Sequence, residues 1–106
     1  MSLQDKFPKY EIAEGDTVFE GMQLHDNIAA LVVLYDHIDS SDVEIYLEQS
    51  VDGKNWNEVA DSTVVLDNKA PSHLYNLNLK NGLYIRVGLH KNTATAGSID
   101  QIRLLS

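Results

Sequence analysis

The sequence has no cysteine, little positive charge and no long apolar run, and each absence excludes a class of protein. Without cysteine, disulfide bonds and thiolate chemistry are excluded. The longest apolar run, residues 29–35, is far shorter than the roughly 20 residues that a membrane-spanning helix needs. The first 16 residues are polar, so we expect no signal peptide.

Negative charge dominates, because 16 Asp and Glu residues outnumber 8 Lys and Arg residues and the net charge is −8. We therefore expect neither nucleic acid nor an anionic membrane as a partner. Residues 1–67 carry 15 acids and 3 bases (−12), whereas residues 68–106 carry 1 acid and 5 bases (+4). Either strands from the two halves interleave and remove this asymmetry, or the molecule has an acidic face and a mildly basic face. The second arrangement would suit head-to-tail packing of identical copies.

Apolar and polar residues alternate with a period of two along much of the chain. The clearest segments are residues 42–49, 73–79 and 82–90, and shorter ones are residues 17–24, 58–59, 63–66 and 99–105. This period predicts half-buried antiparallel strands. The last segment changes phase between Ile99 and Ile102, which predicts a β-bulge. Residues 29–35 do not alternate, so they form either a central strand covered on both faces or a strand whose outer face contacts a partner.

Turn-forming residues separate these segments. Asn81-Gly82 predicts a tight β-hairpin, and Asp52-Gly53 predicts a slightly longer one. No segment has a convincing helical period. We therefore predict an all-β fold, an antiparallel β-sandwich or jelly roll of about seven or eight short strands. It would form a single domain over residues 11–106, preceded by an N-terminal arm at residues 1–10, where Pro8 and three charges do not suit a core strand.

The sequence contains no recognisable catalytic arrangement. Most carboxylates alternate with apolar residues or lie in turns, and neither a nucleophile motif nor a phosphate-binding glycine loop occurs. The histidines lack metal-ligand spacing; they are His25, His37, His73 and His90. We therefore expect no enzyme, no catalytic residue, no metal site and no cofactor.

One acidic stretch leaves an alternative open. Asp36, His37 and Asp39, followed by Asp42, could bring oxygen and nitrogen ligands together. We interpret the stretch as an acidic loop that ends a strand. A structural Ca²⁺ held by an irregular loop is the alternative.

Three aromatic residues are candidates for an exposed surface. Tyr46 and Tyr84 occupy the polar positions of their segments, so pairing of the two strands would place both rings on one surface. Such rings could stack on sugars, or they could pack against cross-strand neighbours. Trp56, the only tryptophan, follows the Asp52-Gly53 turn, and we expect it to begin the return strand and fold onto the core.

Three segments resemble small accessory virion proteins of tailed bacteriophages: EQSVDGKNWNEV (48–59), NGLYIRVGL (81–89) and TATAGSIDQIRLL (93–105). The resemblance consists of a Ser-x-Asp-Gly-x-x-Trp turn, a later Tyr-x-Arg-Val strand and a Thr/Gly-containing loop before a closing strand. Those proteins are β-sandwiches that decorate a capsid or sit on a tail or fibre. The first turn is also similar to one in discoidin-type, galactose-binding-like jelly rolls, which bind sugars or lipid headgroups.

The phage resemblance implies a non-enzymatic structural protein located in the virion, a capsid or tail accessory protein present in many copies. Its partners would be major capsid or tail subunits and further copies of itself. We expect the interface to use the arm and the non-alternating segment; the candidates are Phe7, Tyr10, Leu31, Val33 and Tyr35. The discoidin resemblance implies the alternative, a carbohydrate-binding module in which Tyr46, Trp56 and Tyr84 contact a host glycan.

Overall fold

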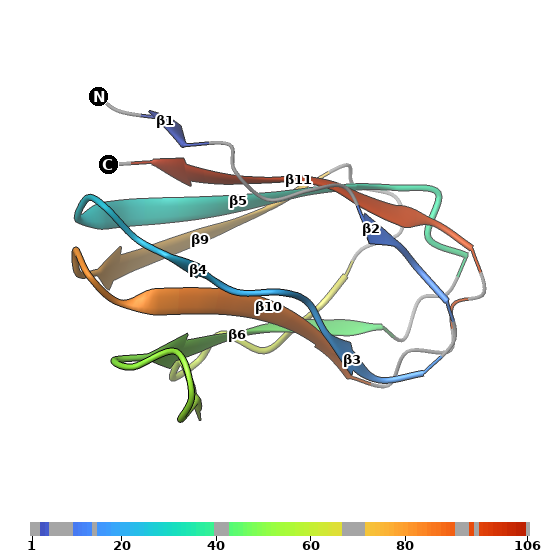
Figure 1. Ribbon diagram of the computed structural model, residues 1–106. Helices are drawn as coiled ribbons and strands as arrows, with labels where there is room; N and C mark the ends of the chain where they lie inside the picture. Colours follow the sequence, from blue (N-terminus) through green and yellow to red (C-terminus); the bar gives the residue numbers. More distant parts are fainter. Residues whose placement is uncertain are drawn as a thin grey trace.

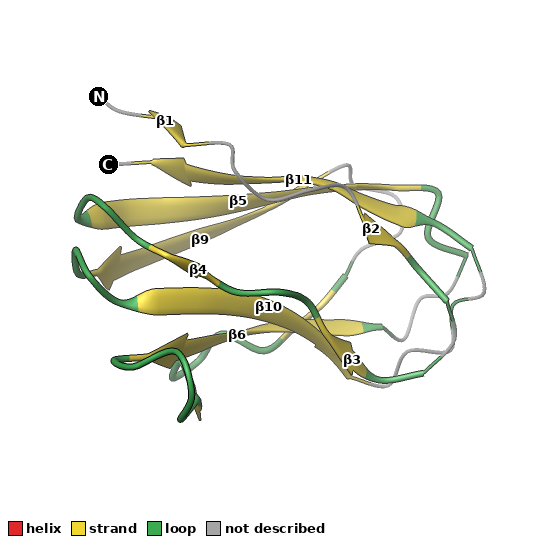
Figure 2. Ribbon diagram, in the orientation of Figure 1, coloured by secondary structure: helices red, strands yellow, loops and turns green. Residues whose placement is uncertain are grey.

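The computed structural model describes residues 3–4, 10–13, 15–39, 43–66, 72–90, 94 and 96–105, which form two antiparallel sheets packed face to face (Figure 1). These residues contain no helix (Figure 2). The predicted all-β sandwich is therefore confirmed.

Sheet A has five strands and sheet B has six. Those of sheet A are β1 (Leu3–Gln4), β2 (Tyr10–Glu11), β5 (Ile28–Asp36), β9 (Ser72–Leu79) and β11 (Ser98–Leu105). Those of sheet B are β3 (Thr17–Val18), β4 (Met22–Gln23), β6 (Glu44–Ser50), β7 (Asn57–Glu58), β8 (Val64–Val65) and β10 (Tyr84–His90). Leu3, Gln4 and Tyr10 pair with β11, so these parts of the predicted arm belong to the sandwich.

Short strands share positions in the sheets, and this sharing reveals a jelly roll. β1 and β2 both pair with β11, β3 and β4 with β10, and β7 and β8 with β6. If each such couple counts as one strand, the order is 1-8-3-6 in sheet A and 2-7-4-5 in sheet B. First then pairs with last, second with seventh, third with sixth and fourth with fifth. This is the pairing of one long hairpin rolled over itself, and it matches the eight-stranded jelly roll.

The two halves of the chain interleave in both sheets. β10 lies between β6 and the β3–β4 couple, and β11 lies between β5 and the β1–β2 couple (Figure 1). The charge asymmetry along the sequence therefore does not divide the molecule into an acidic half and a basic half.

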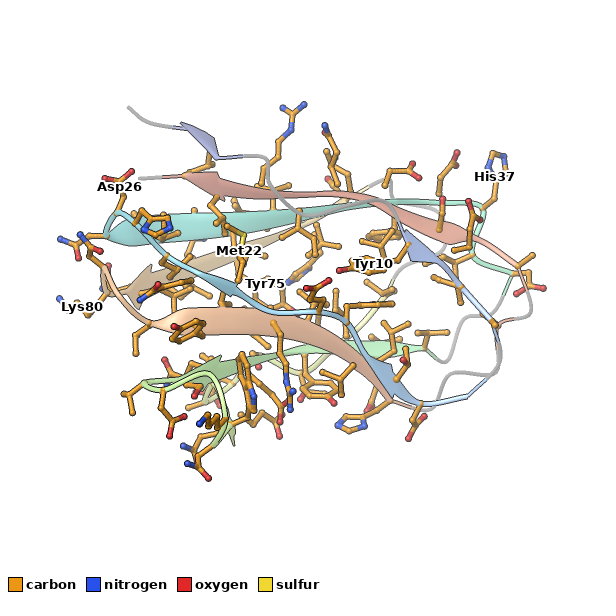
Figure 3. The ribbon with its side chains drawn as sticks, viewed as in Figure 1. Tyr10, Met22, Asp26, His37, Tyr75 and Lys80 are labelled. Carbon is orange, nitrogen blue, oxygen red and sulfur yellow. The ribbon has the colours of Figure 1, made fainter. Side chains whose placement is uncertain are left out.

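The core lies between the sheets and consists mainly of the inward-facing residues of the long strands β5, β6, β9, β10 and β11. Every second residue of a strand points to the same face, so the apolar positions of both sheets meet. The fully buried side chains include Leu31, Val33, Ile45, Leu47, Ile85, Val87, Leu89, Ile99, Ile102 and Leu104. Tyr75 reaches from β9 across this core (Figure 3), and its hydroxyl donates a hydrogen bond of 3.4 Å to the carbonyl of Ile45 in sheet B. Burial raises the pKa of this phenol.

Two local predictions have opposite outcomes. The phase change near the C-terminus is confirmed, because the β5–β11 register shifts between Ile99 and Gln101. The hairpin at Asn81-Gly82 is wrong, because β9 belongs to sheet A and β10 to sheet B. Gly82 does adopt the positive φ of a tight turn, 95°, but its N–H donates to the carbonyl of Leu24 at 2.9 Å. Because β9 and β10 lie in different sheets, this turn crosses the end of the sandwich.

Candidate functional site

The predicted aromatic residues, Tyr46, Trp56 and Tyr84, all lie on the outer face of sheet B. β6 and β10 pair, with Tyr46 opposite Gly88, Glu48 opposite Arg86 and Ser50 opposite Tyr84. Opposite residues of an antiparallel pair share a face, so Tyr46 and Tyr84 lie on one surface as predicted.

Trp56 lies on this same outer face rather than in the core. The guanidinium carbon of Arg86 is 4.1 Å from the centre of its ring, in cation–π geometry, and Arg86 Nε donates to Glu48 Oε1 at 2.7 Å. A Cβ atom at Gly21 would lie 2.7 Å from the edge of the indole, so the ring occupies the space that this glycine leaves. We call Gly21, Glu48, Trp56 and Arg86 the Trp–Arg cluster.

The prediction that Trp56 folds onto the core is therefore wrong. Trp56 is half-buried and anchors the loop after β6 to the outside of sheet B. The cluster also accounts for a second difference: the predicted strand at residues 17–24 is interrupted between β3 and β4, where Gly21 admits the ring.

The loop that carries Trp56 is held by its own hydrogen bonds. Ser50 Oγ accepts from the N–H groups of Asp52 and Gly53 at 3.2 and 2.8 Å, and it donates to Asp52 Oδ1 at 2.9 Å. Asp52 Oδ1 also accepts from the N–H groups of Lys54 and Asn55, both at 2.8 Å. These donors lower the pKa of the Asp52 carboxyl well below its usual range, the Asn55 N–H most strongly. Pairing of β6 with β7 across this loop confirms the Asp52-Gly53 hairpin.

Tyr46 is on the predicted face but is not an exposed ring. It retains only 6% of its accessible surface, and a Cβ atom at Gly88 would overlap its ring. Its other neighbour is the His90 imidazole, which stacks on it at 4.0 Å between ring centres. Burial raises the pKa of the Tyr46 phenol. Tyr46 is therefore unsuited to stacking on a ligand, and the candidate aromatic surface reduces to Trp56 and Tyr84, both half-buried.

An open pocket of about 430 Å³ lies beside the same loop. Its lining is Gln49, Ser50, Val51, Asp52, Asn55, Asn57 and Leu83. Amide groups and an ionised carboxylate can hydrogen-bond a polyhydroxyl ligand, while Val51 and Leu83 supply apolar contact. The pocket lining contains no histidine, lysine or cysteine that could serve as base or nucleophile.

The predicted partner interface is placed differently. Leu31, Val33 and Tyr35 point into the core and are almost fully buried, so their assignment to a partner interface is wrong. The reason is that β5 is central in sheet A and its odd-numbered residues from Leu31 to Tyr35 face sheet B. Tyr10 is half-buried and stacks on Phe19 at 4.2 Å between ring centres. Phe7 lies outside the described residues.

The outer face of β5 and its neighbours is nevertheless apolar. Val32 lies opposite Leu74 of β9 on one side and opposite Arg103 of β11 on the other. Leu34 and Leu105 lie on the same face, and Leu74 is 51% exposed. We call Val32, Leu34, Leu74 and Leu105 the sheet A patch. The sequence contained this signal, since all the residues of 29–35 are apolar, but not which alternate set faces outward.

The acidic stretch after β5 forms a loop at the end of the strand. His37 has a φ of 53° and its Nδ1 lies 2.8 Å from Asp36 Oδ2. Asp39 Oδ1 accepts from the N–H of Ala96 at 3.2 Å, and Asp42 lies outside the described residues. Across the described part of the chain, no group of three or more acidic, histidine or cysteine side chains is arranged to hold a metal ion. The same residues include no helix of the length and hydrophobicity that cross a bilayer.

Comparisons with protein-family models, with curated proteins and with solved structures find no match to this chain.

Proposed function

We propose that this chain is a non-enzymatic accessory protein of a tailed-bacteriophage virion, bound in many copies to capsid or tail subunits. The observation that carries the proposal is the sheet A patch: β5 has already buried its inner face in the core, yet its outer face is apolar as well. Val32, Leu34 and Leu105 are half-buried and Leu74 is exposed, and apolar surface of this kind marks protein interaction sites. The jelly-roll fold fits too, since it is common in viral capsid proteins.

The charges of the molecule would orient such binding. The outer face of sheet B carries Glu44, Glu48 and Glu58, whereas the sheet A patch is bordered by Arg103. Apolar contact at the patch would supply most of the binding energy, and the acidic face would disfavour attachment in the reverse orientation.

Mass spectrometry of purified particles from the phage or lysogen that encodes the chain tests the location. We expect peptides of this protein in many copies per particle. Purified particles in which no peptide of this protein is detected would overturn the proposal.

A matched pair of variants tests the surface. Val32→Asp changes the sheet A patch, and Val18→Asp makes the same change on the outer face of sheet B, where Val18 is exposed. We expect Val32→Asp alone to abolish rebinding of the purified chain to particles that lack it. Val32→Thr, which keeps the strand-forming shape, serves as a milder variant if Val32→Asp lowers the melting temperature.

The alternative, a carbohydrate-binding module, is favoured by one observation: the 50–57 loop that lines the polar pocket also carries Trp56, and the Tyr84 ring lies against Gly53 of the same loop. Aromatic rings next to amide and carboxylate groups are the usual means of holding a sugar. A glycan array with the wild-type chain and with Trp56→Ala would test it. Glycan binding that Trp56→Ala removes supports the alternative, and an array without hits eliminates it.

A further inference from the structure

Among the described residues, the edge strands of the two sheets differ in length. The β1–β2, β3–β4 and β7–β8 couples each contribute two strands of two residues, whereas the remaining edge strand, β9, has eight residues. Within the described part of the chain, β9 pairs only with β5. Its far side therefore presents a row of backbone N–H and C=O groups that can extend the sheet.

From Ser72 to Asn76, β9 also lacks the features that usually prevent edge pairing. Natural edge strands are protected by charged residues, by proline or by bulges. Residues 72–79 read SHLYNLNL, with no Lys, Arg, Asp, Glu or Pro. The register with β5 is continuous from Ser72 to Asn76, and its one shift lies beyond Asn76. Leu74, at the middle of the continuous part, is 51% exposed.

We infer that β9 is a self-association edge, where it pairs antiparallel with β9 of a second copy and extends sheet A across the dimer. The charge distribution selects a second copy as the occupant. Two copies of a chain of net charge −8 repel each other across most of their surface, so they approach most easily where the surface carries no charge. β9 carries no charge, and neither does β5 beside it from Ile28 to Tyr35.

The symmetry of such a dimer supports the same occupant. A two-fold axis places each residue of one edge opposite a residue of the identical edge. In an edge strand that carries charged residues, such pairing can place like charges opposite each other, at a cost in stability. In β9 only uncharged side chains and His73 meet, and burial lowers the pKa of His73, which favours its neutral form.

Sedimentation velocity of the purified full chain tests this inference without any virion, so its failure is distinct from failure of the proposed function. We expect a dimer of twice 11.8 kDa in the wild type. Leu74→Lys should raise the dissociation constant by about tenfold or more, because two lysines would face each other near the two-fold axis. The substitution also reduces the net charge of the chain from −8 to −7, which by itself would weaken the repulsion between copies.

Val65→Lys is the matched control, since Val65 is 57% exposed on the edge strand β8 of sheet B. It should dimerise like the wild type. Hydrogen exchange distinguishes edge pairing from face-to-face contact through the sheet A patch, because only edge pairing protects the outward amides of β9. A wild type that stays monomeric, a dimer unaffected by Leu74→Lys, or a dimer without protection of β9 amides would each overturn the inference.

Discussion

The outer faces of the two sheets differ, although both sheets cover the same core. On the outer face of sheet B, the large side chains contact other residues of the same chain. Trp56 stacks on Arg86, Arg86 pairs with Glu48, and the Tyr46 ring packs flat on Gly88. Sheet A places Val32 and Leu74 side by side, and Leu74 keeps 51% of its surface exposed. The aromatic residues that first suggest a binding site thus stabilise the fold, and the plain aliphatic residues form the better candidate surface.

The largest expected effect separates the two faces of β5. Leu31→Ala should lower the free energy of unfolding by about 2–5 kcal/mol, because Leu31 is fully buried and its removal leaves a cavity. Leu34→Ala removes the same atoms from the outer face and should cost about 1 kcal/mol or less. Urea unfolding measures both variants. Equal costs would mean that the outer face of β5 is covered within the monomer.

Trp56→Ala should cost about 1–2 kcal/mol, less than the roughly 3–5 kcal/mol of a tryptophan in a core. The ring is half-buried and loses its contacts with Arg86 and Gly21. A double-mutant cycle with Arg86→Ala should give a coupling of about 0.5–1 kcal/mol. A cost typical of a core tryptophan, or a coupling of zero, would contradict the cluster as described.

Tyr75→Phe tests the hydrogen bond that joins the sheets. It should cost about 1 kcal/mol, because the Ile45 carbonyl loses a buried donor while the ring remains in place. Tyr84→Phe is the matched control on the outer face of sheet B, and it should change the free energy of unfolding by less than about 0.5 kcal/mol. Similar values for the two variants would remove the Tyr75 hydroxyl from the interactions that hold the sheets together.

The sequence predicted the strands that alternate and could not orient those that do not. β6 and β10 have apolar residues on one face only, so period two defines both the strand and its buried side. In β5 both faces are apolar, one against the core and one at the surface, so Leu31 and Val32 are equivalent in the sequence. Burial of Tyr46 depends on Gly88 opposite, which becomes visible only when the two strands are aligned in register.

The turns at Asp52-Gly53 and Asn81-Gly82 were likewise predictable from their residues, but whether each turn joins two paired strands was not. Gly53 and Gly82 both adopt positive φ, as Asp-Gly and Asn-Gly turns require. One turn joins paired strands and the other joins different sheets, because the choice depends on where distant strands lie. The same limit applies to Trp56, whose position depends on Gly21 and Arg86, both far from it in sequence.

The smallest expected effect concerns the exposed 50–55 loop and its response to acid. The hydrogen bonds to Asp52 lower its pKa in the folded state, whereas an unfolded aspartate has its ordinary pKa of 3.8. As the pH falls through 3.8, the unfolded chain binds the proton first, so the contribution of Asp52 to stability is present above that pH and is lost below it. Asp52→Asn should therefore lower the melting temperature slightly near neutrality, where the charged Asp52 contributes, and flatten the acid limb of melting temperature against pH. Asp61→Asn, which removes one exposed negative charge without touching these hydrogen bonds, should keep the acid limb of the wild type; an unchanged limb in Asp52→Asn would show that the loop opens before the sandwich unfolds.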